Sequence, residues 1–136
     1  MIEHAAFCSM SIPHAEAVLL NHNSRVLQFA SYAFDVSIGD HLNTLLVGGC
    51  ICVPSEEDRL NDIIKAANTL QVNWADLTPS VARTISPMDV PNLETLILDG
   101  EPITLSDRSA WATHVQLVMS YGPVCLVIVA FPRRHY

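Results

Sequence analysis

Three short segments of the sequence combine residue types that could bind a small ligand. Asp35 follows the aromatic residues Tyr32 and Phe34, and a carboxylate in such a place can hold a ligand ammonium through a charge-assisted hydrogen bond. In Asp99-Gly100-Glu101, the glycine permits a positive φ or the close approach of a flat ligand, and the glutamate can accept a hydrogen bond from a ligand amine. In Tyr121-Gly122-Pro123, a stiff turn follows a ring that could stack on a base.

Each segment also has a purely structural interpretation. Asp35 could be the N-cap of a helix that begins at the next residue. The run Asp99-Gly100-Glu101-Pro102 is typical of a plain turn. Tyr121 could equally be a core tyrosine at the end of a strand. The residue types alone therefore leave both interpretations open.

Other chemistries lack their sequence patterns. There is no G-x-x-x-x-G-K and no G-x-G-x-x-G, and the only lysine is Lys65, so these segments could hold part of a nucleotide but not its phosphate tail. No serine lies in a G-x-S-x-G elbow, and we assign no catalytic residue. The cysteines and histidines lack zinc-site spacing, so we expect no metal site, and we expect Cys50 and Cys52 to be buried thiols.

The composition favours a folded chain that does not bind nucleic acid. Half of the 136 residues are hydrophobic, 15% are charged, and 14 acidic residues against 7 basic ones give a net charge of −7. Phosphate neutralisation requires clustered cations, which argues against a nucleic-acid partner. No apolar run reaches the roughly 18 residues that would span a membrane, and the first residues do not resemble a signal peptide. We therefore expect a cytoplasmic protein of one domain at most, with no membrane partner.

Apolar runs alternate with stretches of helical periodicity, which is typical of βαβ units. The pattern predicts strands at 25–30, 50–53, 72–77, 95–98 and 115–119. It predicts helices at 5–20, 36–46, 60–70, 79–85 and 106–111, with Pro13 breaking or kinking the first. The fold class is therefore α/β, with an open, mostly parallel sheet and flanking helices.

Local signals mark several ends of these elements. Asp35 should cap the helix at 36–46, which Gly48 and Gly49 should end, and Thr78-Pro79 is a strong helix start. Residues 55–59 are predicted to form a polar loop. One face of the helix at 36–46 carries four apolar side chains, Ile38, Leu42, Leu45 and Leu46.

In open parallel sheets, ligands bind beyond the carboxyl ends of the strands. The three segments described first each follow a predicted strand. If the strands are parallel, Asp35, Gly100 and Tyr121 should therefore meet at one edge of the sheet.

Taken in order, these segments resemble the adenylation (AMP-binding) domains of fungal nonribosomal peptide synthetases, members of the acyl-adenylate-forming superfamily. The similarity covers nearly all of residues 4–123 and is carried by five stretches, 24–39, 48–59, 77–82, 95–101 and 121–123. Residues 1–123 would then be the central part of an adenylation domain, and residues 124–136 a divergent tail.

The resemblance implies an activity and a set of roles. Such a domain uses ATP and Mg²⁺ to convert an amino acid to an aminoacyl-adenylate, and then passes the acyl group to the thiol of a carrier protein. Asp35 would hold the substrate α-ammonium. The pocket for the substrate side chain would be lined by Val36, Gly39, Asp76, Ile97, Asp99 and Ser120. The adenosine would be contacted by Gly100, Glu101, Tyr121 and Gly122.

The sequence also departs from the family pattern. After Tyr-Gly-Pro the family continues with Thr-Glu, which contact phosphate and Mg²⁺, but Val124 and Cys125 stand here and cannot ligate that ion. The family's phosphate loop would lie upstream of His4, and its ribose-binding aspartate and catalytic lysine would lie further downstream. We therefore expect the isolated chain to be inactive, and whether it uses any cofactor is left open.

An alternative is a non-catalytic remnant that binds adenosine, an amino acid or a larger partner. Asp76 and Asp99 hint at a polar or cationic substrate side chain, although loss of constraint explains them equally well. The eight apolar residues before Pro132 could form a sixth strand. A segment of a larger domain should also expose apolar surface and self-associate.

Overall fold

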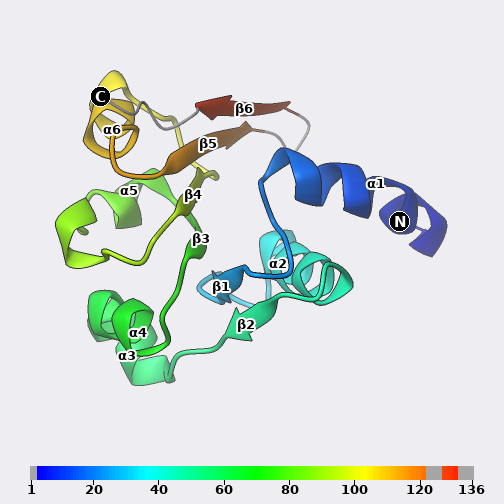
Figure 1. Cartoon of the computed structure of the whole chain (residues 1–136), viewed down its shortest axis with the longest axis horizontal. Coiled ribbons are helices and arrows are strands. Elements are labelled where there is room, and N and C mark those ends of the chain that lie inside the picture. Colours follow the sequence, from blue (N-terminus) through cyan, green and yellow to red (C-terminus); the bar gives the residue numbers. More distant parts are fainter. Residues whose placement is uncertain (1–2, 122–126, 132–136) are drawn as a thin grey trace.

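The computed structural model describes residues 3–121 and 127–131, which contain a six-stranded sheet in the order β2-β1-β3-β4-β5-β6 (Figure 1). The first five strands pair in parallel, and β6 pairs antiparallel with β5. Their bounds are β1 (Arg25–Leu27), β2 (Cys50–Cys52), β3 (Trp74–Leu77), β4 (Thr95–Leu98), β5 (Gln116–Tyr121) and β6 (Val127–Phe131). The predicted α/β class with an open, mostly parallel sheet is confirmed, and the apolar run before Pro132 does supply a sixth strand.

Helices cover both faces of this sheet (Figure 1). On one face lie α1 (His4–Ala17) and α2 (Asp35–Leu46). On the other lie α3 (Glu56–Asn61), α4 (Ile63–Thr69), α5 (Pro79–Ala82) and α6 (Leu105–Trp111), while a short 3-10 helix spans Pro87–Asp89.

The two faces have separate hydrophobic cores, because successive side chains of a strand point to opposite sides. On the side of α3–α6, Leu96 and Leu98 pack with residues such as Ala75 and Trp111. On the side of α1, the core contains Val18, Val26, Trp74, Ile97 and Val118. The Trp74 indole Nε1 donates a hydrogen bond of 2.9 Å to the Val18 carbonyl, which anchors the end of α1 to β3.

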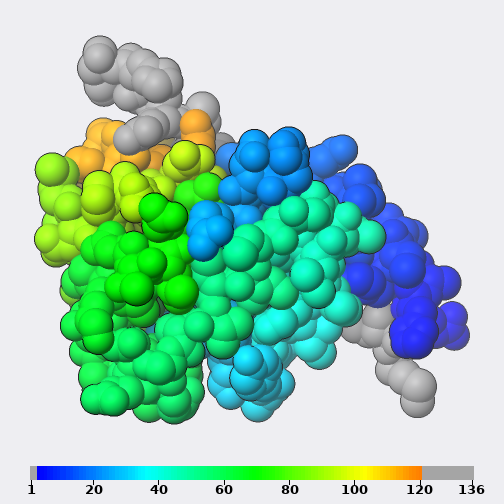
Figure 2. Space-filling view, turned by 60° about the horizontal axis from the view of Figure 1, so that its bottom comes forward, coloured from blue at the N-terminus to red at the C-terminus, as the bar shows by residue number. Residues whose placement is uncertain are grey.

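The orientation of α2 is the main surprise of the fold. Its four apolar residues do share a face, but that face is exposed, with Leu42 46% and Leu45 62% accessible. The buried face carries polar side chains, namely Ser37, Asp40, Asn43 and Thr44. The space-filling view shows the turquoise segment around α2 and β2 at the surface, between the dark blue α1 and the green α3 and α4 (Figure 2). Exposure of this apolar face agrees with the expectation for a segment of a larger domain.

Several local predictions differ from the structure. The first helix runs through Pro13 to Ala17, so of the predicted break or kink at Pro13 the break is wrong. Residues 55–59 do not form a loop, because the Ser55 side chain caps α3 by accepting from the Asp58 amide at 3.1 Å. Cys52 is buried as expected, but Cys50, at the start of the edge strand β2, is exposed.

Polar contacts also fix α5 and α6. Thr78 caps α5 as predicted, although the helix ends at Ala82 rather than near residue 85. Asp107 accepts hydrogen bonds from Arg83 at 2.7 and 2.8 Å, and forms a capping box with Thr104 at the start of α6. This bidentate pair joins the two helices.

Within residues 3–121 and 127–131, no helix has both the length and the hydropathy needed to cross a membrane.

Candidate ligand site at the carboxyl edge of the sheet

Of the three segments singled out in the sequence, Asp35 comes after β1 and Gly100 after β4, whereas Tyr121 is the last residue of β5. These three strands run in the same direction. Because the carboxyl ends of parallel strands share one edge, the backbones at Asp35, Gly100 and Tyr121 lie along that edge. Asp35 begins α2, which returns from this edge toward the opposite one before β2 starts. The topology therefore places the three segments at one edge of the sheet.

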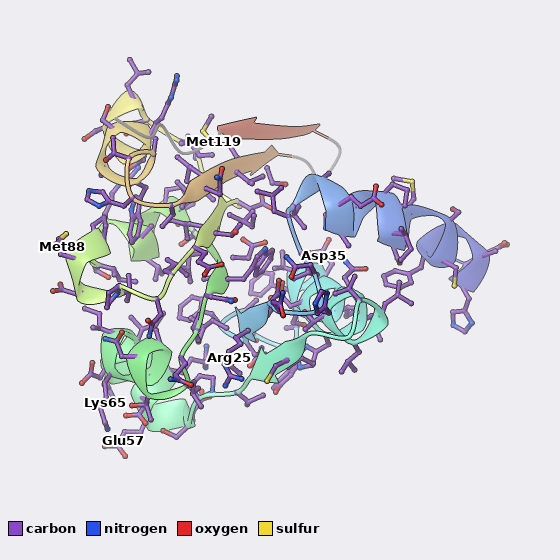
Figure 3. The ribbon with its side chains drawn as sticks, in the orientation of Figure 1. Arg25, Asp35, Glu57, Lys65, Met88 and Met119 are labelled. Carbon is purple, nitrogen blue, oxygen red and sulfur yellow. The ribbon has the colours of Figure 1, made fainter. Side chains whose placement is uncertain are left out.

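Asp35 is exposed and lies in the first turn of α2 (Figure 3). Its carboxylate Oδ1 accepts a hydrogen bond of 3.0 Å from the Val36 amide. The N-cap is Phe34, which makes no side-chain cap bond, so the prediction that Asp35 caps the helix is wrong. An acidic group in the first turn interacts favourably with the helix dipole and remains accessible to a ligand cation.

The segment Asp99-Gly100-Glu101 extends β4 and then turns. The Asp99 amide donates to the Leu77 carbonyl at 3.2 Å, which continues the ladder between β3 and β4. Gly100 has φ +80°, so the positive φ that its sequence context allowed is present, and a larger residue there would be strained. The Asp99 carboxylate accepts from the Gly100 amide at 2.6 Å, as in the turn interpretation.

Glu101 already has partners within the protein. Its Oε2 accepts from the Ser80 amide at 2.9 Å and from the Ser80 hydroxyl at 2.5 Å, at the start of α5. These hydrogen bonds from Ser80 lower the pKa of Glu101. The contact holds the loop after β4 against α5, while the other carboxylate oxygen, Oε1, is not used in these two bonds.

The residues predicted to line a side-chain pocket lie on the α2 side of the sheet. Val36 and Gly39 occupy the first turns of α2 and are partly buried. Ile97 is 1% exposed, packed in the core next to Trp74 and Val118. Asp76 pairs with Ile97 in the register of β3 and β4, and Ser120 lies near the end of β5.

Two residues predicted to contact the adenosine, Tyr121 and Gly122, are not fully described by the structure. For Tyr121, only the strand backbone, which pairs with Val127, is described, and its side chain lies outside the described set. Gly122 lies outside the described residues altogether, as do Val124 and Cys125.

One residue of this site was missed in the sequence. Asp40 on α2 is 6% exposed, and its Oδ2 has no hydrogen-bond partner among the residues described. Burial raises the pKa of Asp40 to about 7. Burial, followed by the negative charges of Asp40 and Asp99, raises the pKa of Asp76 well above its usual range. The sequence feature that could have revealed Asp40 is the polar stripe of α2, formed by Ser37, Asp40 and Thr44.

A hollow of about 380 Å³ lies elsewhere, lined by Gln71, Asn73, Pro91, Asn92, Leu93 and Glu94. These residues precede β3 and β4, so the hollow is at the amino edge of the sheet and contains none of the predicted site residues. Among the described residues, no group of three or more His, Cys, Asp or Glu side chains is arranged to hold a metal ion.

Comparison with known proteins agrees with this architecture. The family model described as AMP-binding enzyme matches residues 1–132. Nonribosomal peptide synthetase rstn8 of Penicillium ochrochloron is 50% identical over 129 residues, which are 94% of this chain and 6% of that protein. Nonribosomal peptide synthetase flvI of Aspergillus flavus is 50% identical over 123 residues, 90% of this chain and 12% of that protein. The chain therefore spans a small part of these relatives.

A solved structure shows the same fold. The adenylation domain AlmE of Vibrio cholerae, in complex with glycyl-adenosine-5'-phosphate, superposes with a TM-score of 0.78 at 20% identity, covering 90% of this chain and 26% of that one. From the family match, the chain belongs to the AMP-binding enzyme family, and its fungal relatives are nonribosomal peptide synthetases.

Proposed function

We propose that this chain forms the part of an adenylation domain that holds the amino acid and the adenosine of an aminoacyl-adenylate. The observation that carries this proposal is the parallel sheet, whose carboxyl edge gathers Asp35, Gly100, Glu101 and the end of β5. A relative of the same fold is described in complex with glycyl-adenosine-5'-phosphate, a ligand of this class.

Each group of the edge supports a different part of the ligand. The exposed Asp35 carboxylate is suited to an α-ammonium, because charge-assisted hydrogen bonds are among the strong ones. Gly100 lets a flat base approach the backbone, and Glu101 offers a carboxylate that Ser80 already orients. Tyr121 would stack on the base, and Gly122 would follow it.

The reaction itself needs groups beyond this edge. In adenylate formation, the carboxylate of the amino acid attacks the α-phosphorus of ATP, and pyrophosphate leaves. Stabilising the charge at phosphorus is the main catalytic demand, and Mg²⁺ would supply part of it. The chain carries Val124 and Cys125 where the family has a hydroxyl and a carboxylate, and neither can ligate Mg²⁺. We therefore propose that the isolated chain binds without catalysing, and that the acyl transfer to a carrier protein belongs to a complete domain.

Binding can be tested by titrating the 136-residue chain with AMP and with a panel of amino acids, and by monitoring each titration with calorimetry and NMR. We expect AMP and at least one amino acid to bind, and Asp35→Asn to weaken the amino acid while leaving AMP unchanged. Glu57→Gln is the matched control, because Glu57 is exposed on α3, far from Asp35 (Figure 3). Absence of binding by both ligand classes would overturn the proposal, and ATP–pyrophosphate exchange by the chain alone would overturn the claim of inactivity.

A further inference from the structure

Three aspartates from separate parts of the chain lie on the α2 side of the sheet, and we call them the aspartate cluster. Asp40 comes from the middle of α2, Asp76 from β3, and Asp99 from the segment after β4. In the register of β3 and β4, Asp76 pairs with Ile97, so Asp99 lies diagonally next to Asp76 on the same side of the sheet. The negative charges of both Asp40 and Asp99 act on Asp76.

Strand alternation explains why they face the same side. Trp74 and Ile97 point into the core on the α1 side of the sheet, so Asp76 and Asp99, two residues further along, point to that side as well. The bond from the Asp99 amide to the Leu77 carbonyl keeps Asp99 in the extended register. Asp40 lies on the buried stripe of α2, the helix that covers this side of the sheet (Figure 1).

The cluster is unfavourable in the protein without a ligand. A buried carboxylate that lacks a partner loses its hydration, and a second carboxylate nearby adds repulsion. Asp40 is 94% buried, since 6% of its surface is exposed, and its Oδ2 has no partner among the described residues. Selection for stability alone would not favour three acidic side chains from separate parts of the chain on one side of the sheet.

Two further buried oxygens on the α2 side of the sheet have no partner among the described residues. Ser120 on β5 is 3% exposed and lies on the same sheet face as Val118, and its Oγ has no partner among the described residues. Asn43, one turn after Asp40 on α2, is 5% exposed, and its Oδ1 is also unpaired in the described part of the chain. The Asn43 oxygen and ionised carboxylates can only accept hydrogen bonds, and the Ser120 hydroxyl can accept as well as donate, so a ligand that donates would satisfy all of them.

We propose that the aspartate cluster receives the cationic side chain of the substrate amino acid, with Asp35 at the edge holding its α-ammonium. This inference rests on the proposed function and specifies its substrate class, an amino acid with a second positive charge. An ammonium has three donors and no acceptor, which complements the carboxylates and the orphan oxygens. The net charge of −7 adds a general attraction for cations. Asp40 is thereby a specificity residue beyond the pocket positions that the family resemblance implied.

L-Lysine and L-norleucine provide the matched pair of probes, because norleucine is lysine without its terminal amine. We expect lysine to bind the chain at least about tenfold more tightly, the size typical of one hydrogen bond to a charged group. Asp76→Asn and Asp40→Asn should each remove most of this preference, whereas Glu57→Gln should retain it. Calorimetry in two buffers of different ionisation enthalpy should also show that lysine releases protons from the cluster at pH 7 and that norleucine does not.

The outcomes separate the two proposals. Equal binding of lysine and norleucine, with AMP still bound, would overturn the cationic substrate class and leave the proposed function standing. Failure of AMP and all amino acids to bind would overturn the proposed function and this inference together. If Mg²⁺ or Ca²⁺ displaced lysine competitively and bound more tightly in the absence of amino acid, the cluster would be a metal site and the inference would be wrong. Circular dichroism of each variant shows whether a loss of binding reflects loss of the fold.

Discussion

Replacing Asp40 by asparagine should make the fold more stable at neutral and mildly alkaline pH. The substitution keeps the shape of the side chain and removes its charge. Burial raises the pKa of Asp40 from its ordinary 3.8 to about 7. Since one pKa unit corresponds to about 1.4 kcal/mol, the whole rise is worth about 4 kcal/mol in the free energy of unfolding.

The sign follows from which state holds the proton. Between about pH 4 and pH 7, folded Asp40 keeps a proton that the unfolded chain releases, so the folded state binds more protons. The free energy of unfolding therefore falls as the pH rises through this window. Asparagine does not titrate, so the variant should lose this part of the pH dependence and exceed the parent by up to about 4 kcal/mol at pH 8.

Urea unfolding at pH 5, 6, 7 and 8, monitored by far-ultraviolet circular dichroism, measures this difference. The curves of parent and variant should diverge with increasing pH, and those of parent and Glu57→Gln should stay parallel. If the parent and Asp40→Asn kept the same difference at all four pH values, Asp40 would not be a buried, titrating carboxyl, and the electrostatic account of the cluster would fail.

Three further changes test other parts of the fold. Asp107→Asn should cost about 2 kcal/mol at pH 7 by weakening the pair with Arg83 and the capping box. Because the hydrogen bond from Arg83 lowers the pKa of Asp107 below 3.8, this contribution should begin to decline in urea titrations as the pH falls below about 4. Trp74→Phe should cost about 1 to 3 kcal/mol by leaving the Val18 carbonyl unpaired, measured in the same way. Polar replacements on the exposed face of α2 should change the free energy of unfolding by no more than about 0.5 kcal/mol per site, and they should reduce self-association in sedimentation velocity. The residues to replace are Ile38, Leu42, Leu45 and Leu46.

The central strands could be predicted because they are largely buried on both faces and therefore form apolar runs, as in β4, whose four residues are all buried. The strand at 95–98 has the predicted bounds, and Thr78-Pro79 starts a helix as its cap chemistry requires. The Ser55 cap was also present in the sequence, three residues before the Asp58 amide that it bonds, so the missed helix α3 could have been found.

The orientation of α2 could not be predicted in the same way. Periodicity identifies an apolar stripe, but it does not say whether that stripe meets this sheet or another surface. The aspartate cluster was hidden for a related reason. Asp40, Asp76 and Asp99 are separated by 36 and 23 positions along the chain, and only the register of β3 and β4 with the returning α2 brings them together.

The outward apolar face of α2 also changes how mutations in this helix should be interpreted. On an ordinary amphipathic helix, leucines are the intolerant positions and polar residues vary freely. In a saturation-mutagenesis survey of this chain, the tolerance along α2 should be reversed, with the leucine positions permissive and Ser37 and Thr44 restrictive. A method that assumes hydrophobic residues lie in the core would therefore assign the wrong tolerance to the leucine positions of this helix.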